Sequence, residues 1–171
     1  DCTMSTLFVN NLNTASGTTI TIPTGKTLKS TDTPIVGAGN VIQVATDRDT
    51  SVMTLGSDQN YHDTGLSIAF TPKYANSIIV IQCMMGAEVS GNSNMGIGFR
   101  LFRDSHQLYQ NDYALYNSSN NAQRIEQVPI LVRETSSNTT ARTYKVMASR
   151  RAGGGTAKVN NYAESYMVIM E

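Results

Sequence analysis

The feature of this sequence that most constrains its fold is a succession of short apolar segments, separated by turn residues, from about residue 63 onward. Apolar and smaller or polar residues alternate over residues 66–71, and residues 78–85 form a nearly continuous apolar run. Alternation is typical of a strand with one covered face, and a continuous run is typical of a central strand covered on both faces. No segment shows sustained helical periodicity with caps.

Further strand-like segments follow along the chain, at residues 97–101, 107–110, 125–132, 144–148, 157–160 and 166–170. Residues 136–138 and 153–155 are predicted loops. Thr, Ser and Asn make up 20, 16 and 15 of the 171 residues, and these types favour turns and the solvent-facing side of strands. We therefore predict an all-β protein whose main domain is a jelly-roll-like β-sandwich of roughly eight strands, with a topology that the sequence leaves open.

The first forty residues differ from the rest, because their large apolar side chains are sparse among Ser, Thr, Asn and Gly. Such a segment cannot bury enough surface alone to offset its ordering entropy, so it is either a disordered arm or a stem ordered by other chains. We predict two parts, an extended stem at 1–38 and a sandwich head at 39–171. The stem residues predicted to dock to other subunits or chains are Leu7, Val9, Leu12, Ile20 and Ile22.

At the start of the head, residues 41–44 read as a strand, and Asp47, Arg48 and Asp49 read as a polar link after it. Cys83 lies inside the continuous apolar run. A buried free thiol is the expected state there, in preference to a disulfide with Cys2.

Charge and hydropathy limit the partners of the chain. The formal net charge is zero and 15% of residues are charged, so the sequence lacks the basic character on which nucleic-acid binding depends. There is no apolar run of about 18 residues and no basic-then-apolar leader, so we expect neither membrane insertion nor a signal peptide.

A search for catalytic residues yields weak candidates. The two histidines, His62 and His106, have no second His or Cys at metal-ligand spacing. Carboxylate pairs for sugar cleavage are Asp47 with Asp49, Asp104 with Asp112, and Glu126 with Glu134, but each residue lies near a turn or strand end, where capping is the usual role. We therefore expect no enzyme activity, no cofactor and no metal.

One segment, residues 108–124, has the composition of a contact surface. Tyr109, Tyr113 and Tyr116 lie there among Asn, Gln and Ser. Aromatic rings beside amides and hydroxyls suit the recognition of sugars or protein surfaces, so these three tyrosines are the predicted receptor contacts. The alternative is a long loop whose tyrosines pack on the sandwich edge.

The order of several short motifs resembles that of short fibre proteins from marine bacteriophages, including those of cyanobacteria. The matching segments are spread over most of the chain and lie at residues 4–10, 16–17, 20–25, 39–44, 64–68, 71–72, 100–104, 143–146 and 167–171. The resemblance implies a homotrimeric tail or head fibre on the virion, made in the host cytoplasm. Its N-terminal part would dock to other virion proteins, and its head would face a glycan or protein of the host surface.

Three rival interpretations remain open from the sequence. One is a capsid decoration protein, in which the chain stabilises the particle and binds no receptor. A second, from another class, is a small polysaccharide depolymerase that uses one of the carboxylate pairs. The third is a cellular lectin-like adhesin, which the lack of a leader disfavours.

Overall fold

The computed structural model describes residue 24 and residues 40–91, 94–118, 122–151 and 153–171. The chain divides into two units, residues 1–38 and 39–171. The predicted stem, with Leu7, Val9, Leu12, Ile20 and Ile22, lies outside the described residues apart from Thr24, so its role stays a prediction.

The described part of the head consists of strands and connecting turns, which confirms the predicted fold class. None of its segments forms a helix with the length and apolar character that a membrane span requires. The strands are β1 (Val44–Asp49), β2 (Met53–Thr54), β3 (His62–Phe70), β4 (Ile78–Gly91), β5 (Met95–Arg103), β6 (His106–Asn117), β7 (Ala122–Thr135), β8 (Arg142–Arg151), β9 (Thr156–Val159) and β10 (Ser165–Met170).

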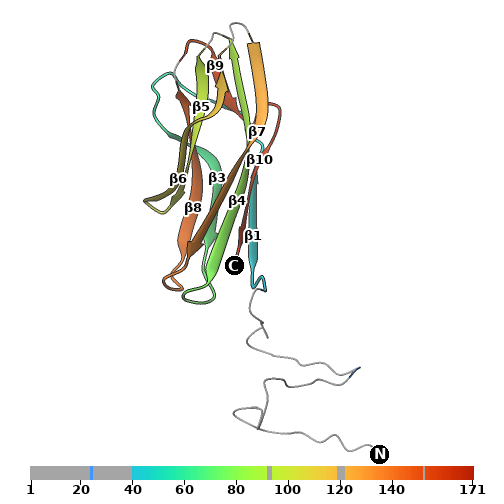
Figure 1. Ribbon diagram of the computed structural model, residues 1–171, viewed down its shortest axis with the longest axis vertical. Coiled ribbons are helices and arrows are strands. Elements are labelled where there is room, and N and C mark those ends of the chain that lie inside the picture. The colour runs from blue at the N-terminus through green and yellow to red at the C-terminus, as the bar shows by residue number, and fades with distance from the viewer. Residues whose placement is uncertain (1–23, 25–39, 92–93, 119–121, 152) are drawn as a thin grey trace, which may run out of the picture. The chain divides into compact units, whose positions relative to one another are not determined.

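These strands form two antiparallel sheets, which face each other in Figure 1. The first, called sheet A, has the order β1-β10-β4-β9-β2, with β7 along the other edge of β4. The second, called sheet B, has the order β3-β8-β5-β6. Leaving aside the short β2 and β9, strand neighbours are first with last, second with seventh, third with sixth and fourth with fifth. That nested pairing of eight strands is the jelly-roll topology, which the sequence alone did not fix.

The core lies between the two sheets and is built by alternation along each strand. Ile79, Ile81, Cys83 and Met85 of β4 are fully buried on the inner side, and Met95, Ile97, Phe99 and Leu101 of β5 face them from sheet B. Cys83 is a free thiol, as expected, and burial raises its pKa to about 12.

Two of the sequence predictions need correction. The predicted strand at 41–44 and polar link at 47–49 are wrong, because β1 begins at Val44 and runs through Asp47, Arg48 and Asp49. Pairing with β10 and a hydrogen bond from the Ser67 amide to Asp47 at 2.9 Å hold these polar residues in the sheet. The predicted short strand at 107–110 is also wrong, since β6 continues to Asn117 and includes most of the expected contact segment.

Candidate functional site

The outer face of sheet B carries a group of tyrosines, two of which lie over glycines of β5. Gly96 and Gly98 alternate with Ile97 and Phe99, whose side chains are fully buried, so the glycines face outward. A methyl group on Gly96 would lie 2.9 Å from Cδ1 of Tyr113, and one on Gly98 would lie 2.6 Å from the Tyr61 hydroxyl. The missing side chains therefore let the tyrosines lie directly on the backbone of the sheet.

Tyr113 and Tyr116 form one half of this surface. Their ring centroids are 5.7 Å apart with an interplanar angle of 83°, which is the favourable edge-to-face geometry. The register of β6 against β5 shifts between Ile97 and Phe99, and this irregularity lets residues three apart share one face. The Tyr116 hydroxyl donates to Oδ1 of Asn94 at 2.6 Å, while Tyr113 remains 54% exposed.

Tyr109, the third predicted contact residue, does not join this surface. It pairs in register with Leu101, whose side chain faces the core, and it packs against the core cluster. The structure thus brings two of the three predicted tyrosines together, and Tyr109 packs against the sandwich.

Tyr61, which the sequence analysis did not single out, forms the other half of the surface. Its ring lies beneath the guanidinium of Arg100, with 3.9 Å between the guanidinium carbon and the ring centroid. The Arg151 guanidinium is 5.4 Å from the same centroid. A Tyr within a polar linker gives no periodic signal, so only the three-dimensional contact with two arginines identifies it.

Asp112 connects the charged groups of this surface, which we call the tyrosine surface (Tyr61, Tyr113, Tyr116, Arg100, Arg151 and Asp112). It accepts hydrogen bonds from the Tyr61 hydroxyl at 2.5 Å and from Gln110 at 2.9 Å, and its carboxylate lies 3.0 Å from Arg151. The hydrogen bond from Tyr61 lowers the pKa of Asp112, while burial and this same bond raise the pKa of Tyr61 to about 12. Near neutral pH the surface therefore presents a neutral phenol, a carboxylate and two guanidinium groups.

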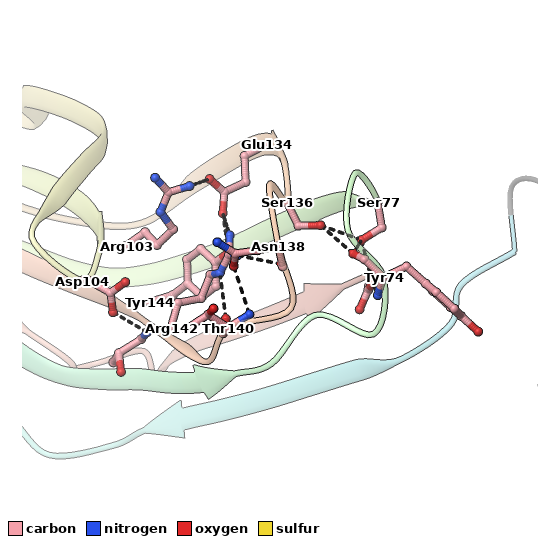
Figure 2. A network of polar contacts seen from close by, with 12 residues as sticks. Tyr74, Ser77, Arg103, Asp104, Glu134, Ser136, Asn138, Thr140, Arg142 and Tyr144 are labelled. Carbon is pink, nitrogen blue, oxygen red and sulfur yellow. Dashed lines mark hydrogen bonds and ion pairs between the residues drawn. The ribbon is translucent and has the colours of Figure 1, made fainter. Parts of the chain in front are cut away.

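A second polar cluster lies at the β7–β8 loop and is shown in Figure 2. Glu134 accepts hydrogen bonds from Arg103 and from the hydroxyl of Tyr144, and Arg142 lies 3.8 Å away from it. Arg142 also donates to the carbonyl of Asn138 at 3.1 Å. Burial, followed by the contact with Glu134, raises the pKa of Tyr144.

The hollow beside this cluster has a volume of about 220 Å³ and is lined by loop residues together with Arg103 and Arg142. Both guanidinium groups are already directed to Glu134. The cluster therefore ties the loop between β7 and β8 to the sandwich.

The candidate catalytic carboxylates are all engaged within the chain. Asp47 accepts from Ser67, Asp49 from Asn160, Asp104 from the Thr143 amide, Asp112 from Tyr61, Glu126 from Arg124 and Glu134 from Arg103. Glu126 and Glu134 lie on one strand eight residues apart, about 27 Å at a rise near 3.4 Å per residue, which is too far for joint sugar cleavage. In the described ranges, no three His, Cys, Asp or Glu residues converge as metal ligands do.

These observations define a jelly-roll domain with an aromatic, charge-bearing surface on one sheet. No family model matches the chain, and no curated protein matches it. Among solved structures, it is similar to the VP2 subviral particle of infectious bursal disease virus, with a TM-score of 0.45, 13% identity, and coverage of 75% of this chain and 37% of VP2. The chain thus spans little more than a third of that protein.

A carbohydrate-binding module is also among the similar structures. It is the CBM36-1 domain of a multidomain xylanase from the hindgut metagenome of Trinervitermes trinervoides, with a TM-score of 0.34 and 14% identity, covering 74% of this chain and 96% of that domain. TM-scores and identities this low assign the chain to neither family.

Proposed function

We propose that this chain is a structural protein of a virus particle whose jelly-roll head binds a carbohydrate on the host surface through the tyrosine surface. Jelly rolls serve as viral capsid and lectin domains, but a fold hosts many functions, so the proposal depends on the site. The resemblance to short phage fibres supports a location on the virion. The observation that carries the proposal is the placement of Tyr113 and Tyr61 against the bare backbone at Gly96 and Gly98, with Tyr116 edge-to-face against Tyr113.

The chemistry of the surface suits a sugar. A pyranose has an apolar face, which stacks on exposed aromatic rings, and a rim of hydroxyls, which need donors and acceptors in fixed positions. Tyr113 supplies an exposed ring, while Asp112 and Arg151 supply an acceptor and a donor beside it. The Tyr116 ring is held by Asn94 and the Tyr61 ring by Arg100, so these two residues lose little side-chain entropy when a ligand binds.

An array of bacterial lipopolysaccharides and capsular polysaccharides tests this function. Wild-type protein is expected to bind at least one preparation, and Tyr113→Ala is expected to weaken that binding by about tenfold or more, as stacking of about 1.5 kcal/mol implies. Tyr162→Ala is the matched control, because Tyr162 is a 65% exposed tyrosine in the β9–β10 loop. Absence of any binding, or equal binding by Tyr113→Ala, would refute the proposal.

The same polysaccharides separate binding from cleavage. A depolymerase would shorten the bound polymer, whereas a binding head leaves its size distribution unchanged in size-exclusion chromatography. We propose binding without catalysis, because Asp112, the carboxylate that contacts the tyrosines, is committed to Tyr61 and Arg151. A retaining or inverting glycosidase needs two carboxyl groups for its acid and nucleophile or base.

The proposal also assigns residues 1–38 to attachment on the particle, with Leu7, Val9, Leu12, Ile20 and Ile22 bringing three copies together beside other virion proteins. Removing residues 4–36 from the gene in the phage tests this assignment. Particles are expected to lose the protein without losing capsid heat resistance. A lowered heat resistance would instead identify a decoration protein that stabilises the capsid.

A further inference from the structure

The outer face of sheet A is apolar over four adjacent strands. Three rows of registered residues cross it, and direct partners in antiparallel strands point to the same side of a sheet. From β1 through β10 and β4 to β7, the rows are Val44, Met170, Val80 and Arg133; Thr46, Val168, Gln82 and Leu131; and Arg48, Tyr166, Met84 and Pro129. We call these twelve residues the apolar face.

Eight of the twelve residues are apolar, and several of them are well exposed in the single chain. Leu131 is 68% exposed, Val44 56% and Tyr166 39%. The two charged residues, Arg48 and Arg133, lie at diagonally opposite corners, and Arg48 is bound to Glu164 outside the face at 2.6 Å. The twelve positions include no acidic residue.

The sequence of β4 shows why this exposure is unusual. Residues 78–85 have the nearly continuous apolar pattern of a strand that is covered on both faces. The described residues cover one face of β4, since Ile79, Ile81, Cys83 and Met85 are fully buried whereas Ile78 on the opposite side is 48% exposed. β10, with the sequence Tyr-Met-Val-Ile-Met after Ser165, repeats the pattern. Contiguous apolar surface of this kind marks an interaction site.

We propose that the apolar face is covered by the same face of a second copy of this chain. Two apolar sheet faces pack on each other at about 10 Å in general, and sheets A and B form the core of the head by packing of this kind. The face carries no carboxylate, and its two arginines lie at opposite corners. Like-charge repulsion between two copies of the face is therefore small. Contact through the face also fits better than contact along the free edge of β7, which contains Pro129 and so lacks one backbone donor.

This interface is separate from the tyrosine surface, which lies on the other sheet, so it stands whether or not the head binds a glycan. A contact between two like faces is two-fold, so it is a different contact from the three-copy one proposed for residues 1–38. Copies joined through sheet A would keep sheet B, and with it every tyrosine surface, open to a ligand.

The first test is the mass of the full chain by light scattering over a concentration series. Wild-type protein is expected to show two or more copies of its 18.5 kDa chain, and Leu131→Glu is expected to shift the dissociation midpoint to at least tenfold higher concentration. Val52→Glu is the matched control, because Val52 is 55% exposed but lies on the loop after β1. A wild-type protein that is still monomeric at about 100 µM overturns the proposal.

A second measurement covers the case in which another contact also holds the copies together. In a Cys2→Ser background, Leu131→Cys and Val52→Cys are labelled with a maleimide, while the buried Cys83 reacts slowly. Leu131→Cys is expected to be labelled about tenfold more slowly than Val52→Cys once the copies associate, and equally fast after dilution to monomers. Equal labelling in an oligomer whose mass Leu131→Glu does not change overturns the proposal.

Discussion

The outer faces of the two sheets differ in the residues that they expose. The outer face of sheet B uses glycines and tyrosines, and its charges are satisfied within the chain, as Asp112 shows with Tyr61 and Arg151. The outer face of sheet A has valine, leucine and methionine where a solvated sheet has threonine, lysine or glutamate. The charged groups of the sheet B face find their partners within one chain, whereas the apolar residues of the sheet A face are buried only when a second copy packs on them.

Apolar residues and aromatic residues on a sheet surface therefore indicate different functions. Tyrosine combines an apolar ring with a hydroxyl, so it tolerates water and still offers contact area to a ligand. Leu131 has no polar group and gains only by burial.

Adding a methyl group under the tyrosine surface should cost the most stability. In Gly98→Ala the new Cβ would lie 2.6 Å from the Tyr61 hydroxyl and 2.9 Å from the Asp112 Cα, so both the ring and the β6 backbone must move. We expect a loss of about 2–3 kcal/mol in the free energy of unfolding, measured by urea titration. Gly56→Ala, where the nearest atom is 3.5 Å away, should change it by less than about 0.5 kcal/mol. Equal values for the two variants would mean that Tyr61 is not held on the sheet.

Removing the charge of Asp112 should have a smaller, pH-dependent effect. Asp112→Asn deprives Tyr61 and Arg151 of a carboxylate, so we expect a loss of about 1 kcal/mol at pH 7, discounted for its partial exposure. The pKa of Asp112 is lowered in the folded state, chiefly by the Tyr61 hydrogen bond, so the stabilisation is present above the unfolded value and is lost as the pH falls through the folded one. Urea titrations at pH 7 and pH 3 should show the difference between wild type and variant shrinking in acid; a constant difference would contradict this.

Tyr61→Phe removes the hydroxyl and keeps the ring over Gly98. We expect it to cost up to about 1 kcal/mol near neutral pH. Because the folded pKa of Tyr61 is raised to about 12, above its usual 10, the hydroxyl stabilises the fold below pH 10 and loses that effect between pH 10 and 12. The difference in unfolding free energy between wild type and Tyr61→Phe should therefore decrease over this range. Tyr144 titrates in both proteins, so subtraction removes its contribution.

Much of the fold could be predicted from the sequence, because period-2 patterning and turn residues report directly on strands. The run at residues 78–85 identified a central strand, and Cys83 within it is buried as expected. Strand pairing could not be predicted, since it depends on contacts between residues such as Val44 and Met170 that are far apart in the chain. The polar residues of β1 also misled the sequence analysis, because their partners, such as Ser67, come from another strand.

The candidate site was predictable only in part, for a local reason. A contact surface containing Tyr113 and Tyr116 followed from composition, but a regular strand would have put residues three apart on opposite faces. The register shift between β5 and β6 puts Tyr113 and Tyr116 on the same face. No turn residue in the sequence indicates this shift. Tyr61 was missed because its role depends on Arg100 and Arg151, which lie on two other strands.

The smallest expected effect on the stability of the single chain comes from a substitution in the apolar face. Leu131→Thr places a β-branched residue, which suits a strand, on β7 and removes apolar surface that is already 68% exposed, so the unfolding free energy of the dilute monomer should change by less than about 0.5 kcal/mol. The same substitution should weaken association, because burial of Leu131 occurs only between copies. Urea titrations at low and high protein concentration separate the two effects, since only the concentrated wild type gains stability from assembly. A large loss in the dilute monomer would show instead that Leu131 is covered within its own chain, and the difference between the two faces would disappear.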